Sequence, residues 1–422
     1  MNNKNAANTS YFCSKLTLLF LVVSLNVFSQ SSNDSIPKCP VKSLSEIFKK
    51  KDSSLTIKSK PKKDSFFLIL PVIGSSPATG FMYGGVTQYT FKGKQDIDKY
   101  SSVNLGVTYT TKDQLLINVK NNLLLNHNKM YFSGDWRYYI FSQDNYGLGS
   151  DIIPKNDKDF NLESLAEPMK YDYFKFHQTA SFRIKGDFYI GGGLHLDGYT
   201  NIDDQQLDIP NGILTEHYLY NKKNGFSNNE YYVNGLSLNL LYDSRDNQVN
   251  ANHGSYANIN FRVNPSFGKN QATSTVLFSE FKHYIPLSET NLQHVLAFWV
   301  YGQFLTRGDL PYLNLPAIGW DKTSRGGRGY TQGLFRGNNI AYLEAEYRFP
   351  ITCNQLISGS VFTNFTSASD RDKDIKLLQY IQPAFGIGLR ILIDKSTRTN
   401  LIINQAWGRH SDAFYLNAGE TF

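Results

Sequence analysis

The segments 326-GGRGY-330 and 339-NIAYLEAEYRFP-350 decide the fold of this chain. The second segment carries apolar side chains at alternate positions: Leu343, Ala345, Tyr347 and Phe349. Charged side chains occupy the positions between them: Glu344, Glu346 and Arg348. Because strand side chains alternate between two faces, one face is apolar and the other is charged. A barrel in a membrane accommodates both faces, with lipid outside and a wet lumen inside, so the pattern predicts a transmembrane β-barrel.

The same alternation recurs along the chain from Ser65 to the last residue. We therefore predict an all-β, 16-stranded antiparallel transmembrane barrel over 65–422. The expected strands are 65–75, 80–91, 100–111, 114–126, 129–142, 171–184, 187–198, 230–243, 254–265, 272–286, 290–306, 338–350, 355–367, 378–394, 398–409 and 411–422. An even number of strands returns both ends of the barrel to one rim. We expect the barrel to be closed, because lipid offers a free strand edge no hydrogen-bond partner.

Connections between the expected strands alternate between short and long. Long ones fall at about 143–170, 199–229 and 307–337. Short periplasmic turns and long extracellular loops are typical of such barrels. This parity places the 326–330 segment in an extracellular loop and both ends of the barrel in the periplasm.

Composition agrees with a barrel and argues against a helical membrane protein. The chain has 422 residues, a net charge of +7 and 14% aromatic residues, and its mean hydropathy is −0.37. Beyond the N-terminus no run of 18 apolar residues occurs, so we expect no transmembrane helix.

The N-terminus reads as a secretory signal peptide over 1–29. Lys4 and Lys15 are basic, residues 16–28 are apolar, and a small-residue cleavage site ends at Ser29. The alternative is a membrane anchor, for which the apolar run is too short.

Residues 30–64 are rich in lysine and show no strand alternation, which is typical of a disordered basic tail. A capping box at Ser43–Glu46 indicates a short amphipathic helix over 43–52, with a solvated linker as the alternative. Cys39 and Cys353 remain after signal cleavage. We interpret them as unrelated residues, while pairing in an oxidising compartment stays open.

Four stretches, in this order, resemble the BamA/TamA family of outer-membrane assembly barrels, members of the bacterial surface antigen superfamily. They are 77-PATGF-81, 241-LYDSRDN-247, the 326–330 loop with the strand that follows it, and 415-YLNAGETF-422. The resemblance covers residues 65–422. It implies a sixth extracellular loop that folds back into the lumen, and it assigns the anchor tip of that loop to Gly327, Arg328, Gly329 and Tyr330.

The chain departs from the family pattern in two places. Residues 30–64 are too few for a POTRA module, so we expect a short member without such modules. The family's F-x-D-x-G strand motif is altered in 362-FTNFT-366, where Asn364 replaces the aspartate.

The resemblance implies that Arg328 anchors the loop by pairing with carboxylates in the lumen. An arginine withdrawn from water needs such partners. Asn364 has no charge, so we expect pairing with Glu346, with Glu344 and Arg348 nearby and Asn364 as a neutral hydrogen-bond acceptor. The alternative is an exposed loop arginine.

Other motifs indicate structure rather than chemistry. Asp243, Arg245 and Asp246 lie at a strand end, where we expect a local turn network in preference to a cation site. The resemblance assigns Gly419 and Phe422 to the closing strand. The histidines lack zinc spacing, and no nucleophile elbow, phosphate loop or nucleic-acid stripe occurs. We therefore expect no enzyme, metal, cofactor or nucleic-acid partner.

The resemblance implies assembly of outer-membrane proteins or translocation of a polypeptide. We expect a weak seam between first and last strands, since Pro71 lacks a ladder donor and Gly84 and Gly85 lie nearby. The expected partners are outer-membrane lipids, a separate periplasmic or lipoprotein partner on the basic tail, and a client polypeptide. A passive channel or small-solute transporter, and a structural or surface-attachment subunit, remain open alternatives.

Overall fold

The computed structural model describes residues 39–47, 65–76, 80–95, 98–154, 159–266, 273–420 and 422. The chain divides into two units, Met1–Pro40 and Val41–Phe422, and every element below belongs to the second. The expected signal peptide, most of the expected basic tail, and Pro77, Ala78 and Thr79 of the PATGF motif lie outside the described residues. Within the described ranges, no helix is long and apolar enough to cross a bilayer.

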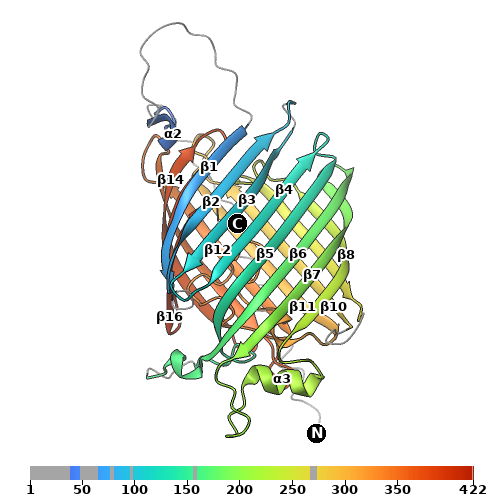
Figure 1. Cartoon of the computed structure of the whole chain (residues 1–422). Helices are drawn as coiled ribbons and strands as arrows, with labels where there is room; N and C mark the ends of the chain where they lie inside the picture. The colour runs from blue at the N-terminus through green and yellow to red at the C-terminus, as the bar shows by residue number, and fades with distance from the viewer. Residues whose placement is uncertain are drawn as a thin grey trace, which may run out of the picture. The chain divides into compact units, whose positions relative to one another are not determined.

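The second unit is a single antiparallel sheet of sixteen strands that pair in chain order and curl into a barrel (Figure 1). The strands are β1 (Ser65–Ser76), β2 (Gly80–Lys92), β3 (Tyr100–Thr110), β4 (Leu115–Leu125), β5 (Met130–Asn145), β6 (Glu167–Lys185), β7 (Phe188–Asp204), β8 (Tyr231–Asp243), β9 (Gly254–Asn264), β10 (Ser274–Pro286), β11 (Val295–Gly308), β12 (Asn339–Pro350), β13 (Ile357–Ala368), β14 (Gln382–Asp394), β15 (Thr399–Gly408) and β16 (Ser411–Ala418). The predicted fold class and strand number are confirmed.

Strand faces divide as the sequence alternation predicts. On β8, Leu236, Leu238 and Leu240 expose 65%, 57% and 46% of their surface, whereas the intervening Asn239 exposes 3%. The outward apolar side chains form the lipid-facing exterior, and the inward polar ones line the lumen.

Two rims bound the barrel. We call the turn rim the one with connections 93–99, 126–129, 186–187, 244–253, 287–294, 351–356 and 395–398. The loop rim is the opposite one, and it carries the 3-10 helices η1 (Leu162–Leu165) and η2 (Tyr312–Asn314) and the helix α3 (Glu216–Asn224). Figure 1 shows α3 beside the loop rim.

The first and last strands lie next to each other but do not form a hydrogen-bonded ladder in the described residues. β1 and β16 are neighbours, yet within the described residues the ladder runs from β1 to β16 with no β1–β16 pairing. The expectation of a fully closed barrel is therefore wrong. The expected last strand is also too long, because Gly419 takes a left-handed φ of 77° and ends β16 at Ala418.

Other boundaries differ for local reasons. β5, β6 and β7 run past their expected ends, because polar residues near the loop rim continue the ladder. The helix α3 replaces part of an expected loop: Thr215 caps its start by accepting from the N–H of Tyr218, and Gly225 ends it at a φ of 74°.

The N-terminal segment forms a shorter helix than the expected 43–52. The helix α2 spans Leu44–Ile47, and the carbonyl of Ser43 accepts from the N–H of Ile47 at 3.2 Å. Residues 48–52 lie outside the described ones. Ile47 is exposed, so the described part of the helix has no buried apolar face. Cys39 and Cys353 are both disulfide-bonded, so their interpretation as unrelated thiols is wrong.

Candidate functional site

The connection between β11 and β12, residues 309–338, is the sixth on the loop rim, and we call it the lumen loop. It contacts opposite walls of the barrel. Tyr199 of β7 donates to the carbonyl of Leu313 at 3.2 Å, and Tyr330 donates to the carbonyl of Pro383 in β14 at 2.6 Å. Leu334 and Phe335 of the loop are completely buried. The loop therefore lies between the walls and is packed as tightly as a core.

Arg328 lies at the tip of the lumen loop with 1% of its surface exposed. Its guanidinium donates through Nη2 to Glu344 and, at 2.7 Å, to Glu346; Nε lies 3.2 Å from Oε2 of Glu344. The Phe362 ring lies under it, with its centroid 3.4 Å from Cζ. Asn364 donates from Nδ2 to the backbone carbonyl of Arg328 at 2.9 Å, so its expected role as an acceptor is wrong.

The residues beside Arg328 explain the glycine-rich composition of the tip. Gly327 and Gly329 have φ values of 79° and 101°, in the left-handed region that side chains disfavour. A Cβ on Gly329 would meet the Cβ of Ala384 at 3.0 Å. The hydroxyl of Tyr330 accepts from the N–H of Arg409 at 3.1 Å. The tip thus fits only with its present backbone geometry.

Glu346 is shared by three arginines. Besides Arg328, it accepts from Arg348 at 2.7 Å and from Arg390 at 2.6 Å. Arg390 also donates to Glu420 at 3.0 Å, and Arg348 lies 3.6 Å from the same carboxylate. The network joins the lumen loop, β12, β14 and the segment after β16.

The segment after β16 turns inward at Gly419 and does not continue the expected closing strand. Arg325 of the lumen loop donates to the carbonyls of Ala418 and Gly419, each at 3.3 Å. Phe422 is 6% exposed and stacks on Trp299 of β11, with centroids 5.3 Å apart. The chain beyond β16 is therefore held by lumen side chains.

The 241–247 motif bridges turns on the turn rim. Asp243 and Arg245 form a bidentate pair with two bonds of 2.8 Å. Asp246 accepts from the N–H of Asn252 at 2.9 Å and pairs with Arg398, which lies between β14 and β15. The Asp243–Arg245 pair is thus a local contact, whereas Asp246 links its turn to another connection of the rim.

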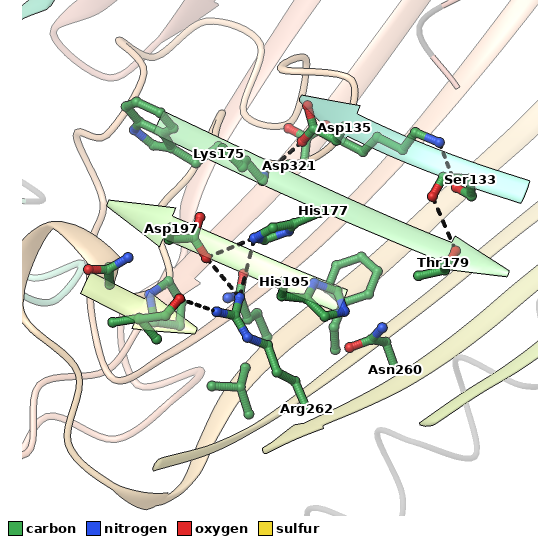
Figure 2. A pocket seen from close by; sticks show the side chains of 18 of the residues that line it. Ser133, Asp135, Lys175, His177, Thr179, His195, Asp197, Asn260, Arg262 and Asp321 are labelled. Carbon is green, nitrogen blue, oxygen red and sulfur yellow. Dashed lines mark hydrogen bonds and ion pairs between the residues drawn. The ribbon is translucent and has the colours of Figure 1, made fainter. Parts of the chain in front are cut away.

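A cavity of about 230 Å³ lies between the lumen loop and the wall formed by β5 to β11. Figure 2 shows polar side chains of this wall pointing toward one another. Asp197 accepts from Tyr173 at 2.9 Å and Arg262 at 2.9 Å, and it lies 2.7 Å from Nε2 of His177. The ring of His195 lies 4.5 Å from that of His177.

A second ionic group lies beside the first in the same wall. Asp135 pairs with Arg137 at 2.8 Å and with Lys175 at 2.7 Å. Lys322 of the lumen loop donates to Ser133 at 2.6 Å. Sequence reasoning missed these residues, because His177 and His195 meet only through the β6–β7 register. The one available signal was that the strand alternation points the side chains of His177 and His195 into the lumen.

In the described part of the chain, no group of three His, Cys, Asp or Glu side chains is arranged to hold a metal. Asp135 and Asp197, in the barrel wall, are paired with cations, and Asp321, in the lumen loop, accepts from backbone N–H groups of Thr323 and Gly326.

The fold resembles that of known outer-membrane barrels. BamA from Haemophilus ducreyi lacking POTRA domains 1–3 is similar, at 15% identity and a TM-score of 0.50, over 85% of this chain and 69% of that one. CdiB from Escherichia coli is similar at 11% identity and a TM-score of 0.50, over 86% of this chain and 63% of that one. At these identities the likeness shows a shared fold alone. No curated protein sequence matches the chain.

Residues 82–422, most of the chain, match the Omp85 superfamily domain. This match covers β3 to β16, most of β2, and the lumen loop with its Arg328 tip. The chain belongs to the Omp85 superfamily and is a barrel of the bacterial outer membrane.

Proposed function

We propose that this barrel assembles outer-membrane proteins or translocates a polypeptide through the seam between β1 and β16. The observation that carries the proposal is the absence, within the described residues, of a hydrogen-bonded ladder between two strands that lie side by side. An unpaired edge offers backbone N–H and C=O groups to an incoming strand.

Features of β1 favour a weak seam. Pro71 lies within β1 and has no N–H to donate, and its partner across the β1–β2 ladder is Gly85. The last strand is short as well: β16 has 8 residues, whereas β1 has 12. β16 therefore offers β1 few backbone groups with which to pair.

A disulfide lock tests the seam. Cysteine pairs are introduced along β1 and β16 at positions whose Cα atoms lie within about 7 Å. The matched control is Ile403→Cys with Leu416→Cys, which face each other in the existing β15–β16 ladder. We expect the β1–β16 lock to abolish insertion of a client barrel into liposomes and the control lock to leave it unchanged. Full activity of the β1–β16-locked barrel would refute the seam.

We further propose that the barrel termini face the periplasm and that residues 30–64 dock a separate periplasmic or lipoprotein partner. Support comes from parity, because both barrel ends lie at the turn rim, and from the basic composition of the segment. Lys42, within this segment, donates its N–H to the carbonyl of Asn354 in the 351–356 connection of the turn rim, which supports the proposal. Co-purification from native membranes, with and without residues 30–64, tests the idea; identical sets of bound proteins would reject it.

The lumen loop weighs against a passive channel. Arg328, Leu334 and Phe335 are buried between the walls, so an open aqueous path would require the loop to move. Planar-bilayer recordings separate the two functions, because a stable large conductance would favour a channel.

A further inference from the structure

Three exposed lysines lie at three consecutive turns of the turn rim, and we call them the rim lysines. They are Lys94 in the β2–β3 connection, Lys129 in the β4–β5 connection and Lys185 at the end of β6. In the described ranges, none of the three ammonium groups forms an ion pair or a hydrogen bond. The three charges are therefore available to an anion outside the protein.

The other cations in the turn connections are compensated within the protein. Each has a carboxylate partner: Lys99 pairs with Asp187, Arg245 with Asp243, Lys395 with Glu46, and Arg398 with Asp246. The 287–294 and 351–356 connections contain no lysine or arginine. Among the turns, unpaired lysines are thus confined to the sector from β2 to β7, whose strands lie next to one another on one flank of the barrel (Figure 1).

Exposed apolar side chains come close to each rim lysine. Ile184 immediately precedes the third rim lysine and is 64% exposed, and Leu125 lies four residues before the second and is 39% exposed. Tyr89, five residues before the first, is 43% exposed and stacks on Phe91. Such outward side chains face lipid. The rim lysines therefore lie where the hydrocarbon layer ends, and long cationic side chains extend from there into the headgroups.

The spacing of the rim lysines lets them act together on a charged surface. Consecutive turns of one rim are two strands apart, which is about 10 Å. The Debye length at physiological salt is about 8 Å, so the fields of neighbouring lysines overlap. A layer of anionic headgroups follows the outer edge of the barrel and reaches all three turns at once. An acidic protein would have to curve around that edge to do the same, so position and charge favour lipid.

We propose that the turn rim between β2 and β7 binds anionic phospholipids, with the headgroup phosphates of phosphatidylglycerol next to Lys94, Lys129 and Lys185. The turns between β8 and β15 lack this preference, because their cations are already paired. Anionic lipid is therefore enriched on one flank of the barrel. The inference goes beyond the proposed seam function, because none of the rim lysines lies on β1 or β16.

Two tryptophans on the outer surface report on the two flanks. Trp136 of β5 lies in the sector with the rim lysines, on the same strand face as Tyr138, which is 44% exposed. Trp407 of β15 is 36% exposed and lies outside that sector. The other two of the four tryptophans are inside the barrel: Trp299 is 1% exposed, and Trp320 belongs to the lumen loop. Quenchers on lipid chains thus reach the first two.

The test measures tryptophan quenching of the full-length barrel in phosphatidylcholine vesicles that contain increasing amounts of dibrominated phosphatidylglycerol or dibrominated phosphatidylcholine. Trp407→Phe keeps the reporter of the sector. In this variant we expect brominated phosphatidylglycerol to reach half-maximal quenching at a mole fraction at least about twofold lower, since each lysine near an anionic surface strengthens attraction about fivefold. In Trp136→Phe the two lipids should quench equally. High salt should remove the preference by screening.

Charge variants assign the preference to the rim lysines. Lys94→Gln, Lys129→Gln and Lys185→Gln together, in the Trp407→Phe background, should abolish it. The three arginine substitutions at the same positions are the matched control and should retain it, because the charge is kept. All three lysines are exposed and unpaired, so the fold should be unchanged, and gel mobility checks this.

Equal quenching by the two lipids in Trp407→Phe, or a preference that survives in the glutamine variant, would overturn the proposal. A glutamine variant that loses a co-purifying protein but keeps the lipid preference would assign the lysines to a protein partner instead. The β1–β16-locked barrel should show the same preference as the unlocked one. Loss of insertion activity with retained lipid preference separates this surface from the proposed function.

Discussion

Replacing Arg328 with alanine removes the cation from a carboxylate that has almost no other partner. Glu344 is completely buried, and among the described residues its one other donor is the hydroxyl of Tyr342. Glu346 keeps two arginines, Arg348 and Arg390, after the change. Most of the penalty therefore falls on Glu344. Removing one partner of a buried ion pair costs about 3–5 kcal/mol, and we expect Arg328→Ala to lower the free energy of unfolding by that amount.

The assay is denaturant unfolding of the barrel in lipid, together with the temperature at which its gel mobility changes from folded to unfolded. Arg371→Ala is the matched control, because Arg371 pairs with Asp309 at 2.5 Å but is 49% exposed. An exposed pair contributes about 0–1 kcal/mol. Adding Glu344→Gln to Arg328→Ala should recover part of the loss, because it removes the orphaned charge. Equal effects of Arg328→Ala and Arg371→Ala, or an unchanged mobility profile, would refute the anchoring role.

Three further substitutions, at the loop tip, beside Phe422 and on the turn rim, are measured by denaturant unfolding. Gly329→Ala should cost about 1–2 kcal/mol, because its φ of 101° is left-handed; an unchanged midpoint would mean that the tip can rearrange. Trp299→Ala should cost about 3–5 kcal/mol by leaving a cavity beside Phe422, and a loss below 1 kcal/mol would indicate that the inward segment is not packed there. Asp246→Ala should cost about 1–3 kcal/mol, since it removes bonds to a buried backbone N–H and to Arg398; Arg398→Ala alone should cost less, and the reverse order would contradict the assignment.

Much of the barrel was predictable because its walls obey a period-2 pattern. The alternation over 339–350 predicts β12 with its observed limits, Asn339–Pro350, almost unchanged. Prediction failed where pairing continues without apolar alternation. β5 extends to Asn145 through polar residues that pair with β6 near the loop rim.

The helix α3 shows a signal that was present in the sequence and not used. Thr215 and Gly225 bracket it as N-cap and left-handed C-cap. Its mostly polar residues lack an apolar stripe, so periodicity alone indicates a loop.

Part of the candidate site was likewise predictable from the sequence, and part was not. The tip with Arg328 was identifiable from motif resemblance, and its carboxylates from their inward parity on the next strand. The cavity was not, because Asp197 and Arg262 lie 65 residues apart and meet across β7, β8 and β9 through the ladder register. The direction of the Asn364 bond was also beyond sequence, since an amide donates or accepts with equal ease.

The ionic network around Glu346 is better understood as a device for position than as a source of stability. Buried ion pairs gain little over apolar packing of the same volume, because desolvation offsets their attraction. Their geometry is restrictive, however: three guanidinium groups reach one carboxylate within 2.7 Å. Arg390 extends the restriction to Glu420, and Arg325 fixes the carbonyls at the end of β16. The last strand is thus tied to the lumen loop, while the described part of β1 pairs with β2 alone. If the seam opens as proposed, the strand that moves is β1, because moving β16 would break buried charge contacts and moving β1 would not.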